Sequence, residues 1–408
     1  MKGAVCLIAT MDTKAKEARF LRDEILKSGL EVILIDVGIR KESPKDADIT
    51  QRTVLGENAD KIKSAKTRAE AAGYMASGLR RVVRKLYESG RLAAALAVGG
   101  SGGTTLASEA MHVLPVGVPK VIVSTMASGN TLPYVQGEDI LLLNPVVDIQ
   151  NLNFLTRHAL RSAAGIIKAM TEVTPVRDDG KDTVAITGFG VTTPCVDACA
   201  KRLEELGYEV LVFHARGVSG GRIMEKMIAE GRFKGVLDLT TSEIADEVGG
   251  GIYAVGKQRL RTAAQMGIPY VVTPGALEMI NLGSEETITE EQKKRVLYRH
   301  SPSSVKLRAD REEMRKAAGI FAERLGDNQG NVAVLAAKRG FSMVNREGQV
   351  FYDPEADAGF LEELYAESRG RFPITVLDCH HNDMAFADAC VEALLELMDR
   401  KRRGGNGE

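Results

Sequence analysis

The chain has 408 residues, 44% of them hydrophobic, and its 54 Lys and Arg side chains nearly balance 55 Asp and Glu. That length predicts two or three domains with sizeable apolar cores, and the charge balance argues against nucleic-acid binding. No apolar run approaches the roughly 18 residues that a membrane span requires. The five cysteines include no C-x2-C pair, which argues against a disulfide framework. We therefore expect a globular, cytoplasmic protein that binds neither nucleic acid nor membrane.

Short apolar runs alternate with amphipathic helical patterns, which is typical of parallel sheets covered by helices on both faces. Five strands are expected first, at 3–10, 31–37, 92–98, 119–125 and 140–146. After a polar linker, TEVTPVRDDGKD at 171–182, six more are expected at 183–188, 209–215, 234–239, 269–273, 332–336 and 374–378. The sequence thus predicts an α/β chain of two Rossmann-like, doubly wound parallel-sheet domains in tandem, residues 1–176 and 177–408.

The two halves share a layout that indicates a distant duplication. GAVCLIATMDTKAKEARFLRDEILKSGLEVILIDVG and TVAITGFGVTTPCVDACAKRLEELGYEVLVFHARG each read strand, threonine-bearing loop, helix, Gly-x-Glu-Val and strand. The glycine loop VGGSGGT after the third strand is not repeated, since LDLTTSEIADEVGGG stands at the matching place. We therefore expect the two copies to have different functions.

Two loops of the first half could form a phosphate cradle. With a flavodoxin-like strand order, TMDTK (10–14) and GGSGGT (99–104) face each other where the strand order reverses, the place at which open α/β sheets bind ligands. Both loops end a strand and open a helix, whose free N–H groups and dipole favour an anion. The glycine loop fits neither G-x-G-x-x-G nor the P-loop pattern, so a packing turn without a ligand is the alternative.

Side chains of these loops supply the chemistry that a nucleotide needs. Hydroxyls can donate to phosphate oxygens, and the Lys14 ammonium can neutralise a distal phosphate. Asp12 would hold Mg²⁺ or a ribose hydroxyl, or would cap the helix expected to begin near Thr13. The loop STMASGN (124–130) would form an adjacent wall or an ordinary strand-to-helix turn. The candidate nucleotide-binding residues are Thr10, Asp12, Thr13, Lys14, Gly99, Gly100, Ser101, Gly102, Gly103, Thr104 and Thr125.

A family resemblance runs over essentially the whole chain. It is carried, in order, by IATMDTK, VGGSGGT, PKVIVSTMASGN, ITGFGVTTPCVDAC, EVLVFHARGVSGGRIMEKMI, GVLDLTTSEIADEVGGG, FYDPEADAGF and HHNDMAFADA. These motifs resemble the Tm-type ATP-binding domain family, named for a plant virus-resistance protein and rich in uncharacterised bacterial members. The resemblance implies two Rossmann-like subdomains, ATP bound by the N-terminal one at the 10–14 and 99–104 loops, and homodimers. It implies no particular reaction.

Histidines at two strand ends are candidate catalytic residues. DCHHND (378–383) places His380 and His381 after a late strand, where a metal site, an acid–base role or a structural role is open. His214 ends the strand of VFHARG beside Arg216 and several glycines. That segment could bind an anionic substrate or form a plain turn.

Two helical clusters also have two interpretations each. Cys195 and Cys199 lie one helical turn apart after VTTP. One of them could be a reactive thiol whose pKa the helix dipole lowers, or both could be small packing residues. Glu243, Asp246 and Glu247 share one helical turn. Their carboxylates could assist a bound metal ion, or they could form a solvent-exposed helix face.

Two classes of function remain open. In the first, ATP with Mg²⁺ binds the N-terminal half, and the C-terminal half brings a small anionic metabolite into a shared cleft, as in an ATP-dependent transferase, ligase or hydrolase. In the second, nucleotide stabilises a homodimer that binds a partner without turnover. Hydroxyl, His and acidic residues at the strand ends of the second half favour the enzyme. The broadly apolar pattern NFLTRHALRSAAGIIKAM favours a dimer.

Overall fold

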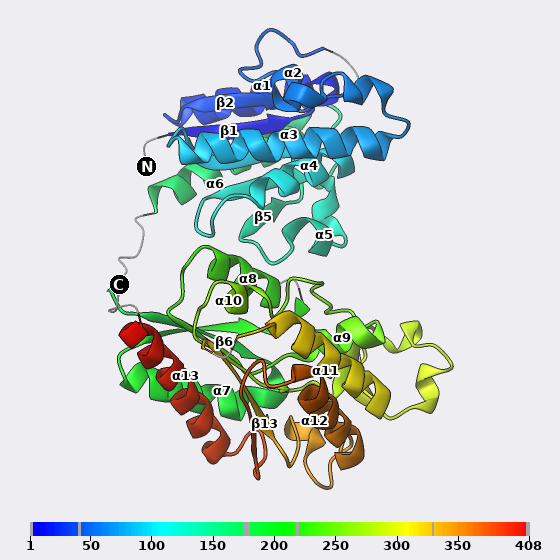
Figure 1. Cartoon of the computed structure of the whole chain (residues 1–408). Coiled ribbons are helices and arrows are strands. Elements are labelled where there is room, and N and C mark those ends of the chain that lie inside the picture. The colour runs from blue at the N-terminus through cyan, green and yellow to red at the C-terminus, as the bar shows by residue number, and fades with distance from the viewer. Residues whose placement is uncertain (1–2, 40–41, 174–179, 218–219, 329, 405–408) are drawn as a thin grey trace. The chain divides into compact units, whose positions relative to one another are not determined.

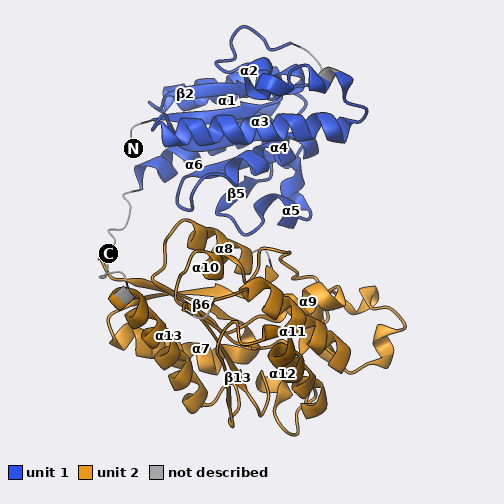
Figure 2. Cartoon of the chain, viewed as in Figure 1, with its two compact units in different colours: residues 1–177 blue, residues 178–408 orange. Residues whose placement is uncertain are grey.

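A computed structural model describes residues 3–39, 42–173, 180–217, 220–328 and 330–404 of the protein (Figure 1). The chain divides into two compact units, residues 1–177 and 178–408 (Figure 2). The linker expected at 171–182 lies only partly among the described residues. Helix α6 (Phe154–Glu172) includes its first two positions, and 174–179 lie outside the described part.

The N-terminal unit is a five-stranded parallel sheet of order β2-β1-β3-β4-β5. Its strands are β1 (Ala4–Ala9), β2 (Val32–Asp36), β3 (Leu92–Gly99), β4 (Lys120–Ser124) and β5 (Ile140–Leu143). β1 and β3 are buried along their whole length, because helices cover both faces of the sheet. The parallel doubly wound sheet expected from the sequence is therefore confirmed.

Two pairs of helices enclose this sheet. The helices α1 (Met11–Lys27) and α6 pack on one face, and α3 (Arg68–Glu88) and α4 (Ser101–Met111) on the other. Two short helices, α2 (Gln51–Leu55) and α5 (Leu132–Val135), lie in the connections after β2 and β4. Each long helix buries one apolar stripe, as in the run Met75, Leu79, Val83 and Leu86 of α3.

The C-terminal unit holds a six-stranded parallel sheet of order β14-β13-β9-β8-β6-β7. Its strands are β6 (Thr183–Gly188), β7 (Glu209–His214), β8 (Gly235–Asp238), β9 (Tyr270–Val272), β13 (Val332–Ala337) and β14 (Ile374–Leu377). In each unit the first strand lies between the second and the third. This shared order agrees with the duplication expected from the sequence.

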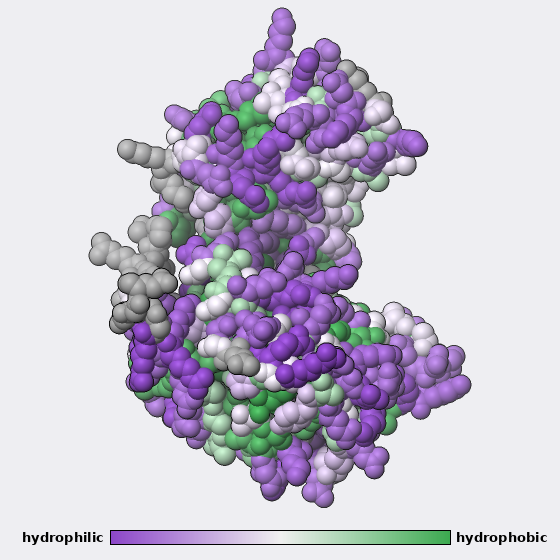
Figure 3. All heavy atoms as spheres, in the orientation of Figure 1, coloured by the Kyte–Doolittle hydropathy of each residue, from purple (hydrophilic) through white to green (hydrophobic). Residues whose placement is uncertain are grey.

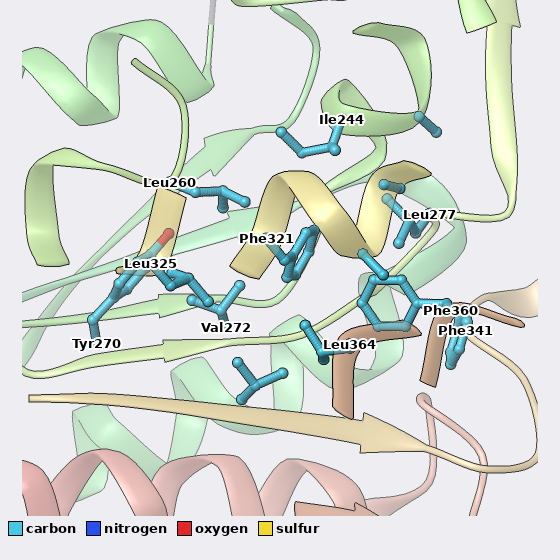
Figure 4. Packing of buried hydrophobic residues seen from close by; sticks show 14 of the residues in the cluster. Ile244, Leu260, Tyr270, Val272, Leu277, Phe321, Leu325, Phe341, Phe360 and Leu364 are labelled. Carbon is cyan, nitrogen blue, oxygen red and sulfur yellow. The ribbon is translucent and has the colours of Figure 1, made fainter. Parts of the chain in front are cut away.

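Helices again cover both faces. The helices α7 (Thr193–Glu205) and α13 (Met384–Gly404) pack together on one face. The other face carries α8 (Gly221–Ala229), α9 (Ser242–Gly249), α10 (Thr262–Gln265), α11 (Arg311–Leu325) and α12 (Pro354–Ser368). Figure 4 shows Phe321 and Phe360 in this core, with ring centroids 5.2 Å apart in an edge-to-face arrangement that aromatic pairs prefer.

A three-stranded antiparallel sheet of order β10-β12-β11 was not expected from the sequence. It is formed by β10 (Met279–Leu282), β11 (Leu297–Ser301) and β12 (Ser304–Arg308). The run LYRHS of β11 is polar and partly exposed, so it carries no apolar signal in the sequence. Residues of this sheet form one wall of a pocket in the C-terminal unit.

The surface is mostly hydrophilic on the face in Figure 3, with smaller apolar areas. Within the described residues, no helix combines the length and apolar character needed to cross a membrane.

Candidate functional site

The two predicted loops meet at a pocket of about 260 Å³ in the N-terminal unit. β1 and β3 are adjacent and parallel, so the loops that follow them leave the sheet at the same edge. The residues lining the pocket are Thr10, Asp12, Thr13, Lys14, Val37, Ile39, Arg68, Ala72, Gly100, Ser101, Gly102, Gly103 and Leu106. Most of the candidate nucleotide-binding residues are thus brought together. Gly99, Thr104 and Thr125 are outside this lining.

Helix α4 begins at the glycine loop. Its N-cap position is Gly100, which has no side chain to cap the helix, and its first turn holds no acidic residue. The first N–H groups of a helix have no partner within the helix, and they carry the positive end of its dipole. The backbone of residues 101–103 is therefore suited to an anion in the pocket.

The fold itself does not require glycine at three positions of this loop. A Cβ added at Gly100, Gly102 or Gly103 would meet no atom closer than 3.6 Å, and none of the three has a positive φ. Gly99 differs, because its Cβ would lie 2.9 Å from the Cα of Gly103. Within helix α4, at Gly102 and Gly103, glycine costs about 0.5–1 kcal/mol relative to alanine. Gly100, Gly102 and Gly103 therefore leave bare backbone beside the pocket, and neither the backbone conformation nor a neighbouring atom requires it.

Asp12 connects the loop that follows β1 to the loop that follows β2, at one side of the pocket. Helix α1 begins at Met11, so Asp12 lies within the first turn, and the N-cap interpretation of Asp12 is wrong. Its Oδ2 accepts a hydrogen bond from the backbone N–H of Ile39 at 3.2 Å. Because Asp12 also lines the pocket, its carboxylate is placed beside any ligand there.

Among the described residues, two cationic side chains line the pocket. The Lys14 ammonium donates to the carbonyl of Ile149, which holds it at the pocket wall. Arg68 is the first residue of α3, and Thr67 caps that helix by accepting from the N–H of Glu70 at 3.1 Å. Arg68 was missed in the sequence, because it follows no strand. The local sequence TRAE indicates a helix start. It does not indicate that Arg68 lies in the same pocket as Lys14 and Gly102.

Thr104 and Thr125 have supporting positions. Thr104 is fully buried, donates to the Gly100 carbonyl at 2.9 Å and lies 2.6 Å from Ser124 Oγ. It fastens the glycine loop to the end of β4. The Thr125 hydroxyl would be the nearest atom to a Cβ at Gly100, at 3.8 Å, so the third loop borders the glycine loop.

Asp36 ends β2, the place where dinucleotide-binding folds often hold a ribose hydroxyl. Here its carboxylate is buried and accepts from the N–H of Met11 at 2.9 Å, the N–H of Gly38 at 2.8 Å and the hydroxyl of Ser43 at 2.6 Å. These bonds tie the loop after β1 to the loop after β2. Asp36 therefore holds these two loops in place without itself lining the pocket.

The corresponding crevice of the C-terminal unit is filled by buried side chains. Between the loops after β6 and β8, Thr192 and Thr240 hydroxyls lie 2.8 Å apart, and Thr187 donates to Asp238 at 2.7 Å. All four residues are fully buried. The place that forms the pocket in the first unit is thus part of the core in the second.

The two histidines of DCHHND lie in the interior. His380 is held between the Ser342 carbonyl, 3.0 Å from Nε2, and the Asn382 N–H, which donates to Nδ1 at 3.1 Å. His381 is fully buried, neither ring nitrogen has a hydrogen-bond partner among the described residues, and burial lowers its pKa to about 3. Both rings are placed for packing, and His381 cannot contact a substrate in this arrangement.

His214 is the exposed candidate. It ends β7, its Nδ1 lies 3.2 Å from the Gly188 carbonyl, and its ring packs against Phe189 with centroids 5.2 Å apart. With Arg216 it lines a pocket of the C-terminal unit.

The two helical cysteines are packing residues. Cys195 and Cys199 are both buried in α7. A hydrogen bond with Cys199, together with burial, raises the pKa of the Cys195 thiol well above its usual value. A reactive thiol needs the opposite shift, so that interpretation is wrong.

The acidic turn of α9 is not a solvated face. Glu243 and Asp246 are fully buried, and Glu247 pairs with Arg324 at 2.5 Å. Burial raises the pKa of Glu243 and of Asp246 to about 7 each. Over the part of the chain that the structure describes, no cluster of three or more His, Cys, Asp or Glu is arranged to hold a metal ion.

Glu243 belongs to a buried network around Arg259. The Arg259 guanidinium donates to Glu243 Oε2 at 2.5 Å and to Asp238 Oδ1 at 2.6 Å, and Tyr270 donates to Asp238 at 2.6 Å. The arginine is fully buried. The network joins β8, β9, α9 and the segment before α10.

Comparison with known proteins places both units in one family. The N-terminal domain of the Uncharacterised protein family (UPF0261) matches residues 3–175, and its C-terminal domain matches residues 181–398. The chain belongs to this family. Its membership confirms the family resemblance of the motifs and assigns no activity.

Bacterial and plant relatives match the chain almost from end to end. A UPF0261 protein of Clostridium tetani is 39% identical over 98% of this chain and 100% of its own length. A UPF0261 protein of Mesorhizobium japonicum is 36% identical over 96% and 98%. The ToMV resistance protein Tm-1(GCR237) of Solanum lycopersicum is 37% identical over 98% of this chain, which spans 56% of the tomato protein.

Among solved structures, an uncharacterized protein from Bacillus cereus ATCC 10987 aligns with 85% of this chain and 98% of its own. Its sequence identity is 11% and its TM-score is 0.28.

Proposed function

We propose that the N-terminal unit binds ATP, with the phosphates against residues 100–103 and the loop 10–14. The observation that carries the proposal is the bare backbone of Gly100, Gly102 and Gly103, which the fold does not need and which faces a pocket at the start of a helix. Glycine is the residue that lets a backbone approach phosphate oxygens closely. Lys14 and Arg68 add positive charge on the same pocket.

The space available supports a nucleotide rather than a simple ion. The phosphate pocket of about 260 Å³ shares Ile39 with a second pocket of about 520 Å³, which lies over residues 42–62. Ligand pockets for molecules of this size commonly measure about 300–1,000 Å³. We propose that the nucleoside lies toward the second pocket, where Ile39 and Leu55 provide apolar contact.

The experiment that tests the proposal is calorimetry with Mg-ATP on nucleotide-free protein. We expect saturable binding with one ATP for each chain. Arg68→Met should weaken binding by about three- to tenfold, because an exposed arginine contributes a screened interaction. Arg84→Met is the matched control, since Arg84 is also exposed on α3 but does not line the pocket. Absence of binding at millimolar ATP would contradict the proposal and would favour a packing turn without a ligand for the glycine loop.

Asp12 is proposed to help hold Mg²⁺ beside the phosphates. Its carboxylate lines the pocket, and Mg²⁺ prefers such oxygen ligands together with phosphate oxygens. We expect Asp12→Asn to reduce the gain in ATP affinity that Mg²⁺ gives, while affinity measured in EDTA stays the same or rises. Titrations with and without Mg²⁺ measure this gain. An equal gain in both proteins would rule out a magnesium role for Asp12.

We propose that ATP serves a reaction on a small anionic metabolite. Exposed His214 and Arg216 on the C-terminal unit support this choice, because binding of ATP alone gives no reason for them. The alternative is a nucleotide-stabilised dimer that binds a protein partner without turnover. Release of ADP, AMP or phosphate in the presence of candidate metabolites separates the two.

A further inference from the structure

The C-terminal unit has a pocket of its own, of about 540 Å³. One side is formed at the ends of β6 and β7, by Phe189, His214 and Arg216, and the other side by residues of β11 and β12. The antiparallel sheet therefore brings Tyr298 and Lys306 over the strand ends. No carboxylate lines this pocket within the described part of the unit.

Lys306 is the buried charge of this pocket. Only 3% of the residue is exposed, its ammonium donates to Asn281 Oδ1 at 2.7 Å, and it lies 4.6 Å from the centroid of the Phe189 ring. Of the residues that the structure describes, no carboxylate forms an ion pair with Lys306 within 4.0 Å. Burial lowers the pKa of its ammonium to about 8, and the more distant carboxylates of Asp246 and Glu278 oppose that shift. The Asn281 amide donates to the Asp246 carboxylate at 3.3 Å. An ammonium has three donors, and a buried charge is costly without a counter-charge.

The remaining lining defines the shape and charge of a suitable ligand. Arg216 donates to the Tyr253 hydroxyl at 2.9 Å, and its guanidinium lies 5.2 Å from the Tyr253 ring centroid. The wall of the pocket includes the aromatic rings of Phe189, Tyr253 and Tyr298. A ligand with one anionic group and a flat apolar body would satisfy both features. A carboxylate is such a group, and it can pair with the Lys306 ammonium and also accept from the nearby Arg216 guanidinium.

We propose that this pocket binds a small aromatic carboxylate, whose carboxylate pairs with Lys306 and whose ring contacts the aromatic wall. This inference names a ligand class for the metabolite of the proposed function, and in that respect rests on it. Its test contains no nucleotide. Failure of ATP binding and failure of this site are therefore separate results.

The test is calorimetry of the full chain with 2-naphthoate, using neutral 2-naphthamide of the same shape for comparison. A probe of this size that fits its pocket reaches a Kd of about 1 mM. We expect one naphthoate for each chain and at least tenfold weaker binding of the amide. Equal affinities, no binding at about 5 mM, or tighter binding of 2-naphthyl phosphate by tenfold or more would each overturn the proposal.

Variants assign the binding to the pocket. Lys306→Met should weaken naphthoate at least tenfold and should reverse the preference in favour of the amide, because the counter-charge is replaced by an apolar chain of similar size. Lys316→Met is the control, since Lys316 is exposed on α11. Arg216→Gln changes an exposed residue, so it provides a second test if Lys306→Met does not fold. We expect it to weaken naphthoate binding about threefold. Unchanged affinity in both pocket variants would contradict the assignment.

Discussion

Replacement of Arg259 by methionine is expected to lower the free energy of unfolding of the C-terminal unit by about 3–5 kcal/mol, the range measured when one partner of a buried ion pair is removed. The arginine is fully buried between Asp238 and Glu243, with donor–acceptor distances of 2.5–2.6 Å to these carboxylates. Methionine fills part of the space but leaves Asp238 and Glu243, and also Glu225 at 3.8 Å, without this counter-charge. Urea unfolding of the full chain, followed by hydrogen exchange in residues 235–260, measures the loss.

The pH dependence of this loss follows from the buried carboxylates. Burial raises the pKa of Glu243 to about 7, and Arg259 opposes that rise. Without the arginine the folded-state pKa rises further, so the folded variant binds more protons than the unfolded chain. Its stability is then highest below the unfolded pKa and falls as pH increases. We expect a smaller deficit at pH 5 than at pH 8.

Arg232→Met serves as the control for Arg259. Arg232 is 55% exposed and pairs with Glu230 at 3.7 Å, so its removal should cost no more than about 1 kcal/mol. A loss for Arg259→Met no larger than that of the control would show that the buried network contributes little. A pH-independent loss would show that the carboxylates stay hydrogen-bonded and ionised without the arginine.

The second large effect is expected for Gly100→Val, which should weaken ATP binding at least about tenfold while the N-terminal unit stays folded. Gly100 has a φ of −83°, and the nearest atom to an added Cβ is 3.8 Å away, so the fold accepts a side chain. The valine would occupy the space proposed for phosphate oxygens. Loss of one or two charge-assisted hydrogen bonds costs about 1.5–3 kcal/mol each, and about 1.4 kcal/mol corresponds to tenfold.

Calorimetry with Mg-ATP measures this effect, and Gly165→Val is the matched control. Gly165 lies on α6, where an added Cβ would meet no atom within 4 Å. The control should bind ATP as the unchanged protein does. Gly100→Ala should give a smaller loss than valine, because its side chain is shorter. Folded Gly100→Val protein with unchanged ATP affinity would remove the main support for the phosphate cradle.

The sequence by itself determined the features that depend on local patterns. Strands such as β1 and β3 are continuous apolar runs because helices cover both faces of the sheet, and these runs can be read without partners. The loops 10–14 and 99–104 were likewise visible, since glycine and hydroxyl residues after a strand mark a strand-to-helix turn. Their meeting at one pocket followed from the strand order, which the structure confirms.

Only the tertiary structure decided which polar side chains face a pocket and which are buried. Arg68 reaches the phosphate pocket, and Lys306 lies over the ends of β6 and β7, through packing between elements far apart in the chain. Glu243 reads as one of several acids on an exposed turn, yet it is buried because Arg259 supplies its counter-charge. The cost of burying a polar group depends on its partners in space, and a local pattern contains no information about them.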